Sequence, residues 1–260
     1  MKTKHITLSF DLESYQNTGY SKEEQFEYSK KGLEILLNIL KVHNIKTTFF
    51  TTYFFAQKYP LVIRRLIKEG HEIASHGYRH SSNYKKFNDQ QLFQRLKKSK
   101  DYLEKEFNVQ ILGFRAPRLQ KVSPKLLRQV GFKYDSSLHP TFVPFRYFNI
   151  FKSTNINKRN GLLIVPISVS PVFRFPFSWI WFKKQPLSHS LSCLNSFFKS
   201  HNHALAYFHP WEFNESQKDF DILRKKFLIL VNYLKNKGVK FVTIESYLKQ
   251  NGFITSVSNL

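Results

Sequence analysis

The chain has 260 residues, with 41 Lys and Arg against 18 Asp and Glu and a formal net charge of +23. Its length allows a full hydrophobic core, and no Gly/Ser/Pro-rich linker or internal repeat divides it, so we expect one α/β domain over residues 1–260. The single cysteine, Cys193, excludes an intrachain disulfide and a cysteine-based zinc site.

The positive charge limits the classes of partner that the protein is expected to bind. Such an excess attracts polyanions, namely nucleic acid, anionic lipid or a phosphate-bearing substrate, although a Lys-rich genomic composition would give the same count without any partner. No nucleic-acid module is recognisable, so specific nucleic acid is not expected. No apolar run approaches the length of a membrane span, and the N-terminal apolar stretch is too short for a signal peptide. We expect a cytoplasmic protein, with peripheral contact at the inner, anionic membrane face left open.

Short apolar strands alternate with amphipathic helices along the first half of the chain. The expected strands are 5–10, 46–50, 71–75 and 110–114, and the expected helices are 23–43, 57–69 and 89–106. Ser123 and Pro124 begin a further helix as N-cap and first residue, and this helix ends at Gly131. The alternation predicts a parallel sheet or barrel with helices outside.

Residues 141–200 break this alternation. The segment is rich in Phe, Pro, Trp and Lys and contains one plausible strand at 162–169. We interpret it as an insertion over the mouth of the site, whose aromatic residues pack onto the barrel or grip a sugar or lipid. The regular pattern then resumes with a strand at 204–208, a helix at 217–237 and a strand at 239–243.

Polar side chains follow the predicted strands directly. They are Asp11, Glu13, His76, His80, Arg115, Asp135 and His209. In a parallel α/β barrel the carboxyl ends of the strands form one rim, so residues far apart in sequence would converge there.

A carboxylate and two imidazoles in this set suit a divalent metal. His76 and His80 are four residues apart, so on a helical turn they would face the same cation, and Glu13 would supply a third ligand. Zn²⁺ is the default ion for such ligands, and Co²⁺, Ni²⁺ or Mn²⁺ could replace it. Asp11 would then act as a general base held ionised by Arg115, and His209 could protonate a leaving amine.

Five ordered motifs resemble those of the polysaccharide deacetylases, the NodB-homology or carbohydrate esterase family 4 group. They are Ser9-Phe-Asp-Leu-Glu13, His76-Gly-Tyr-Arg-His80, Gly113-Phe-Arg-Ala-Pro-Arg118, Tyr134-Asp-Ser-Ser137 and Tyr207-Phe-His-Pro-Trp-Glu212. The resemblance spans about residues 5–245. It implies a distorted (β/α) barrel of seven strands and metal-dependent hydrolysis of an N-acetyl group from an amino sugar, through a tetrahedral oxyanion intermediate.

The resemblance also assigns roles to single residues. Asp11 matches the family's catalytic base, and His76 and His80 match its two metal-binding histidines. Arg115 matches the arginine that pairs with the base, and His209 matches the general acid.

Two positions depart from the usual family pattern. Leu12 stands where the metal-binding aspartate is usual, and Glu13 is offered instead, which looks like a branch that includes exopolysaccharide-locus deacetylases. Arg118 replaces an aromatic residue that many members carry, which favours a charged substrate such as a phosphate-linked or uronic sugar. Asp135 and Trp211 are further candidates for binding the substrate.

Several candidates have a purely structural alternative, and His76 and His80 could simply be loop residues. Asp11 could cap a turn, Glu13 could be an exposed carboxylate, and Asp135 could accept hydrogen bonds in an Asx-turn. Arg115 could satisfy strand-end carbonyls, and Trp211 could pack beneath the rim.

The expected activity is removal of an N-acetyl group from an amino sugar in a polysaccharide or a lipid-linked glycan precursor. One alternative on the same fold is a deformylase or a hydrolase of small cyclic amides. Another is a non-catalytic barrel that binds anionic glycan through its charge, although a binding module needs no base, acid and metal ligands together.

Overall fold

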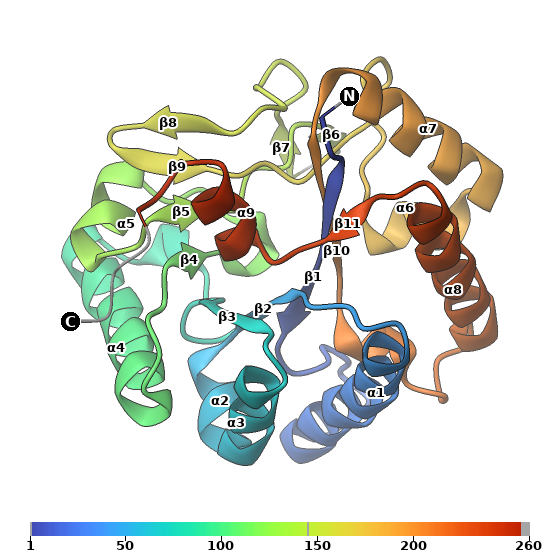
Figure 1. The fold of residues 1–260 in the computed structure, drawn as a ribbon. Helices are drawn as coiled ribbons and strands as arrows, with labels where there is room; N and C mark the ends of the chain where they lie inside the picture. Colours follow the sequence, from blue (N-terminus) through green and yellow to red (C-terminus); the bar gives the residue numbers. More distant parts are fainter. Residues whose placement is uncertain (1, 145, 256–260) are drawn as a thin grey trace.

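Seven parallel strands curl into a barrel-like sheet in the computed structural model, which describes residues 2–144 and 146–255 (Figure 1). In sheet order they are β10 (His203–Phe208), β1 (His5–Leu12), β2 (Thr48–Thr51), β3 (Glu72–Ser75), β4 (Gly113–Phe114), β5 (Tyr134–Asp135) and β9 (Leu162–Ile164). Beyond β9, the backbone N–H of Ser168 donates to the carbonyl of Leu205 in β10 at 2.9 Å, which links the two ends of the sheet. The expected α/β fold, a distorted barrel of seven strands, is confirmed.

Two short strands extend this sheet, and helices cover it. The strand β8 (Asn157–Arg159) pairs antiparallel with β9, and β11 (Lys240–Phe241) pairs with the start of β1. The helices are α1 (Lys22–Val42), α2 (Tyr53–Lys58), α3 (Pro60–Lys68), α4 (Asp89–Phe107), α5 (Pro124–Val130), α6 (Trp179–Lys184), α7 (Leu187–Ser200), α8 (Phe220–Asn236) and α9 (Ile244–Gln250). All except α9, which lies across one end of the barrel, surround the sheet (Figure 1).

Local chemistry decides where several helices begin and end. The helix expected at 57–69 is two helices, because Pro60 begins α3 and holds Tyr59 outside the helical region. Ser123 stands at the N-cap of α5 as expected, yet its side chain makes no capping bond. Gly131 ends α5 with φ of 102°, a left-handed conformation that glycine adopts without strain.

Residues 141–200 are not one insertion. Strands β6 (Phe142–Val143) and β7 (Tyr147–Phe148) form a separate hairpin, but β9 belongs to the main sheet and α7 packs against β10 and α8 as a regular barrel helix. Leu187, Leu191 and Leu194 recur at helical spacing along α7, a signal that the aromatic composition of the segment concealed.

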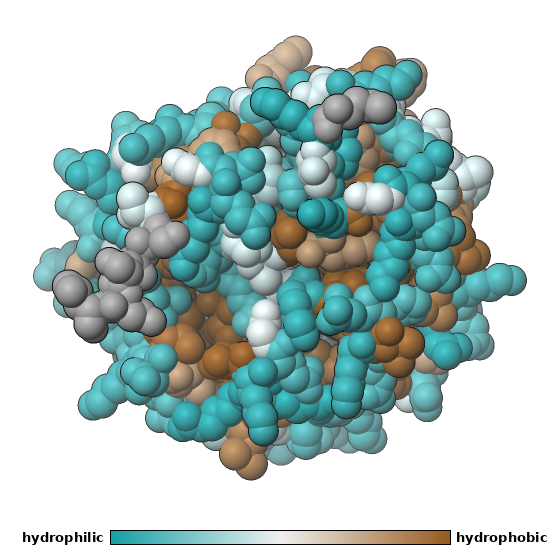
Figure 2. Space-filling view, in the orientation of Figure 1, coloured by the Kyte–Doolittle hydropathy of each residue, from teal (hydrophilic) through white to brown (hydrophobic). Residues whose placement is uncertain are grey.

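The core has an outer layer between sheet and helices and an inner layer within the barrel. The inner layer includes Phe50, Tyr134 and Leu205. At one end of the barrel, Ile244 and Leu248 of α9 pack against this layer and close it. The face that carries α9 is largely hydrophilic, as the net charge predicts, with hydrophobic residues gathered in smaller areas (Figure 2). Among the described residues, no helix is long and apolar enough to cross a membrane.

A buried carboxyl group joins α9 to the sheet. Glu72, at the start of β3, accepts hydrogen bonds from the hydroxyls of Thr48 and Tyr134, both at 2.6 Å, and from the backbone N–H of Glu245 at 3.0 Å. Burial, together with the nearby charge of Glu245, raises the pKa of Glu72 from 4.5 to about 7. The neutral form is therefore favoured in the folded protein below about pH 7.

Stability should fall between about pH 5 and pH 8 because the folded chain holds the Glu72 proton more tightly than the unfolded chain. The raised pKa corresponds to a loss of about 3 kcal/mol once the group is ionised. We expect Glu72→Gln to remove this part of the pH dependence, measured by urea unfolding across that range. The exposed Glu215→Gln should change nothing, and an unchanged pH dependence in Glu72→Gln would contradict the assignment.

Candidate metal centre

The ends of neighbouring parallel strands bring the predicted polar residues to one rim. Asp11 lies near the end of β1, and His76 and Arg115 directly follow β3 and β4. Asp135 ends β5, and His209 directly follows β10. All five side chains are buried. The convergence expected of a barrel rim is therefore present.

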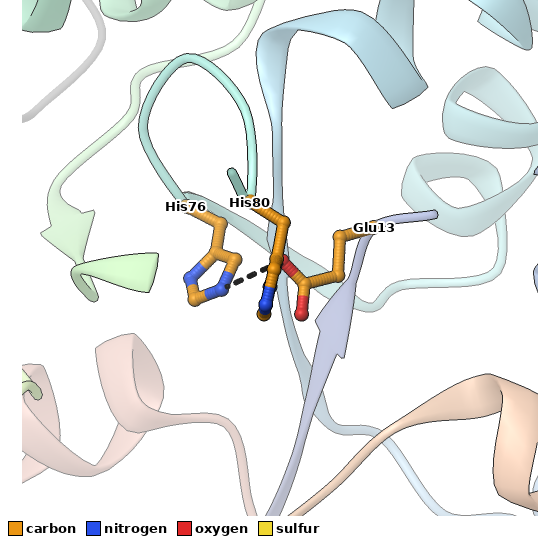
Figure 3. A group of neighbouring side chains, drawn as sticks. All are labelled: Glu13, His76 and His80. Atoms are coloured by element: carbon orange, nitrogen blue, oxygen red, sulfur yellow. Dashed lines mark ion pairs between the residues drawn. The ribbon is translucent and has the colours of Figure 1, made fainter. Parts of the chain in front are cut away.

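Glu13, His76 and His80 converge from two strand ends. Glu13 follows β1, both histidines belong to the loop after β3, and the three side chains point toward one another (Figure 3). One ligand atom from each residue lies within 4.8 Å of the others. The Glu13 carboxylate is 3.3 Å from His76 Nε2 and forms a closer ion pair with His80 Nδ1.

These three residues fit a metal ion. Both Glu13 carboxylate oxygens and His80 Nδ1 are buried and face only other members of the site, without a hydrogen-bond partner outside it, an arrangement that a bound cation would satisfy. His76 Nδ1–H donates to the carbonyl of Arg115 at 2.9 Å, so Nε2 is the ring nitrogen that faces the site and could bind a cation. Burial alone would raise the pKa of Glu13, but the imidazoles of His80 and His76 hold it well below its usual range.

The loop that carries the histidines requires glycine at one position. Gly77 has φ of 71°, and a Cβ atom there would lie 2.2 Å from the Tyr84 hydroxyl. A larger residue would be strained and would also displace Tyr84. Gly77 therefore fixes the turn that brings His80 back toward Glu13.

Arg115 connects the metal centre to the neighbouring carboxylate. Its Nη1 donates to Asp11 Oδ1 at 2.7 Å, and its Nη2 donates to the hydroxyls of Ser9 and Ser136 at 2.9 and 3.1 Å. The second Asp11 oxygen lies 3.8 Å from His76 Nε2. Asp11 is thus held against the ligand set but keeps one oxygen that does not contact Arg115.

His209 enters the site from the opposite side. Its Nε2 lies 4.0 Å from Glu13 Oε1, and its ring stacks on Trp211 at 4.0 Å. On the other edge of the ring, Nδ1 lies 3.7 Å from Glu212 Oε1, while the His209 backbone N–H donates to Glu212 Oε2 at 3.3 Å. Gly32 of α1 allows this turn to pack closely, since a Cβ there would lie 2.2 Å from the Pro210 carbonyl.

The three predicted substrate-binding residues lie in different surroundings. Arg118 is exposed at the rim, with its Nε 3.5 Å from His80 Nε2. Asp135 accepts bonds from the backbone and hydroxyl of Ser137, the Asx-turn alternative, and burial raises its pKa to about 6. Trp211 is buried behind His209, which favours the alternative that it packs beneath the rim.

Sequence reasoning missed Ser9, Ser136 and Glu212 as parts of the site. The two serines are inconspicuous because their contacts to Arg115 span 106 and 21 residues of chain. The sequence does contain a signal for Glu212. A carboxylate three residues after a histidine lies beside that histidine when the chain makes a helical turn. The 3₁₀ turn η3 (Pro210–Phe213) makes that return.

Comparison with known proteins identifies the family. The sequence model of the polysaccharide deacetylases matches residues 1–134. The chain belongs to the polysaccharide deacetylase family. A peptidoglycan-N-acetylglucosamine deacetylase of Bacillus cereus is 36% identical to it over 70 residues, which are 27% of this chain and 25% of that protein. The match thus spans about a quarter of this curated relative.

Solved structures share the fold at low identity. A Mycobacterium smegmatis protein described as a polysaccharide deacetylase superposes with a TM-score of 0.70 at 20% identity, covering 100% of this chain and 96% of its own. The Puue allantoinase gives 0.69 at 18% identity, covering 96% and 92%. A pseudoenzyme of the group, BA3943 from Bacillus anthracis, gives 0.54 at 17% identity, covering 94% and 65%. At these identities the likeness shows the fold alone.

The purified protein should contain about one divalent ion per chain, because three ligand-type side chains converge and the Glu13 oxygens and His80 Nδ1 have no hydrogen-bond partner outside the site. We expect Glu13→Ala and the His76→Ala, His80→Ala double variant each to lose that ion in elemental analysis. His189→Ala, on α7, should retain it. Wild type that takes up neither Zn²⁺ nor Co²⁺ would contradict the site, and Co²⁺ loading adds a visible spectrum as a second readout.

Proposed function

We propose that this protein is a metal-dependent carbohydrate N-deacetylase. The observation that carries the proposal is the combination at one rim of three metal-type ligands, a carboxylate paired with a buried arginine, and a histidine on the opposite side. Membership of the polysaccharide deacetylase family supports the reaction class. The amide of an N-acetyl sugar needs a nucleophilic water, charge stabilisation at the carbonyl and a proton for the leaving amine.

Each group has a separate task in this proposal. Glu13, His76 and His80 would hold a divalent ion, Zn²⁺ by default, which polarises the acetyl carbonyl and acidifies water. Asp11 takes the proton of the attacking water through the carboxylate oxygen that does not contact Arg115. Arg115 fixes the orientation of Asp11 and compensates its charge where bulk water is excluded.

His209 gives a proton to the departing amine. Its Nε2 faces the metal ligands, while Trp211 and Glu212 fix the plane and rotation of its ring. Glu212 is buried, and although burial raises its pKa, the contacts with His209 oppose that shift. We assign Glu212 as a positioning residue that acts through His209.

The proposal for the substrate names a chemical class. We propose an N-acetylated amino sugar in a polysaccharide or a lipid- or phosphate-linked precursor, because exposed Arg118 beside His80 suits an anionic group. Position 12 carries leucine in place of the usual aspartate, and Glu13 follows it. This supports assigning the chain to the branch of the family in which the acid two residues after the base binds the metal. A cytoplasmic location at the inner membrane face belongs to the same proposal, supported by the net charge of +23.

A deformylase or cyclic amide hydrolase is the second candidate, since an allantoinase shares the fold. The rim chemistry would serve either amide. A non-catalytic glycan-binding barrel is the third candidate, since a pseudoenzyme also shares the fold.

Asp11→Asn should lower kcat by about 10²–10⁴-fold because it removes the proton acceptor and keeps the side-chain shape. Acetate release from N-acetylglucosamine oligomers, with metal content measured in parallel, tests this. Metal content should remain near the wild-type value.

Asp101→Asn, on the exposed face of α4, is the matched control and should retain activity. Metal-loaded wild type that releases formate from an N-formyl sugar, or opens a cyclic amide, without releasing acetate would establish the second candidate. No hydrolysis of any of these amides would favour the third.

Glu212→Gln should lower kcat roughly 10- to 100-fold with little change in KM, because His209 loses its orienting partner and counter-charge. A purely structural role would lower thermal stability but leave kcat of the folded variant at the wild-type value, and that result would reject the assignment.

A further inference from the structure

Exposed aromatic residues gather beside the candidate metal centre. Phe142, Phe148, Phe151, Val172 and Phe173, which we call the aromatic tip, have exposed fractions between 51% and 83%. Among the described residues, four of the five exposed phenylalanines belong to this tip. Single exposed apolar residues are ordinary, but a contiguous group of large ones marks an interaction surface.

Two chain segments form the tip as one unit. The hairpin β6–β7 and the residues after it supply three phenylalanines, and rings 148 and 151 lie in edge contact at 5.6 Å. The second segment contributes Val172 and Phe173. The Thr141 hydroxyl donates to the Arg174 carbonyl at 2.8 Å, and Arg174 Nη1 reaches the Lys152 carbonyl at 3.4 Å. The tip therefore has a defined shape.

The charge around the tip has one sign. The chain contains no acidic residue between Asp135 and Glu212, whereas it has eight Lys and Arg in that interval. Three of these cations, Arg146, Lys152 and Arg174, belong to the segments that carry the tip. An anionic surface would therefore meet no repulsion from a carboxylate in this interval.

The position of the tip links it to the rim. Arg146 Nη2 donates to the carbonyl of Arg118, which lies beside His80, and the Tyr147 hydroxyl contacts His139 Nδ1 at 2.7 Å. A surface that meets the tip would also lie close to the metal ligands.

We propose that the aromatic tip and its flanking cations dock onto an anionic lipid bilayer. Aromatic side chains partition into the headgroup and acyl boundary, and Lys and Arg bind the anionic headgroups above it. Carbohydrate is a poorer match, since the rings pack edge-on against one another and Val172 offers no stacking face. Docking does not depend on catalysis and is tested separately from it.

Co-sedimentation of the full chain with phosphatidylcholine vesicles, with and without phosphatidylglycerol, tests the proposal. The Phe148→Ser, Phe151→Ser, Phe173→Ser variant should bind the anionic vesicles at least about a hundredfold more weakly, since each buried ring is worth roughly tenfold. The Arg146→Gln, Lys152→Gln, Arg174→Gln variant should lose the preference for anionic lipid. The His76→Ala, His80→Ala variant should bind like wild type.

A matched control removes three exposed apolar residues elsewhere, Val42→Ser, Leu61→Ser and Ile229→Ser, and should bind vesicles like wild type. Thermal unfolding checks that each variant is folded. Equal vesicle binding by the tip variant and wild type would overturn the proposal. It would also be overturned if the tip substitutions abolished self-association, or binding to soluble chitin oligomers, and left vesicle binding intact.

Discussion

A fully buried guanidinium holds the rim of this barrel in one arrangement. Arg115 follows β4, yet its side chain binds Ser9 and Asp11 of β1 and Ser136 after β5, and its carbonyl orients His76 after β3. Its cation also lies 4.0 Å from the Phe50 ring centre. A buried cation is tolerable only when all its donors are satisfied, so the surrounding strands must take up this register together. The same interactions that make burial of Arg115 tolerable orient Asp11 and His76.

Much of this arrangement follows from local patterns. Helices α1 and α4 and strands β1 and β10 have strong periodicity and clear boundaries, and the alternation of strands and helices predicts a parallel sheet. The polar residues at the strand ends then meet because parallel strands end at one edge. The sequence alone therefore predicts which types of side chain meet at the rim.

The remaining features depend on contacts that local patterns do not encode. Strands β4 and β5 have two residues each and are defined only by their pairing with neighbouring strands. Local propensity therefore predicts too long a strand at 110–114, where β4 covers only Gly113–Phe114. In the segment 141–200, aromatic composition conceals a regular helix, and the sequence leaves Trp211 open both to substrate contact and to packing beneath the rim, where it stacks on His209. In both cases the type of an aromatic residue does not decide its role, because burial and packing against distant segments decide it.

The groups of the site and the exposed tip are under different constraints. Asp11, the three metal-type ligands and Arg115 lie in the first half of the chain, and they are constrained by ion geometry and by a buried charge. In the second half, β9, β10 and His209 are constrained because they belong to the barrel and its rim. The exposed residues of the aromatic tip carry neither constraint. A lineage could therefore acquire a new target by altering the tip alone, without rebuilding its hydrolytic machinery.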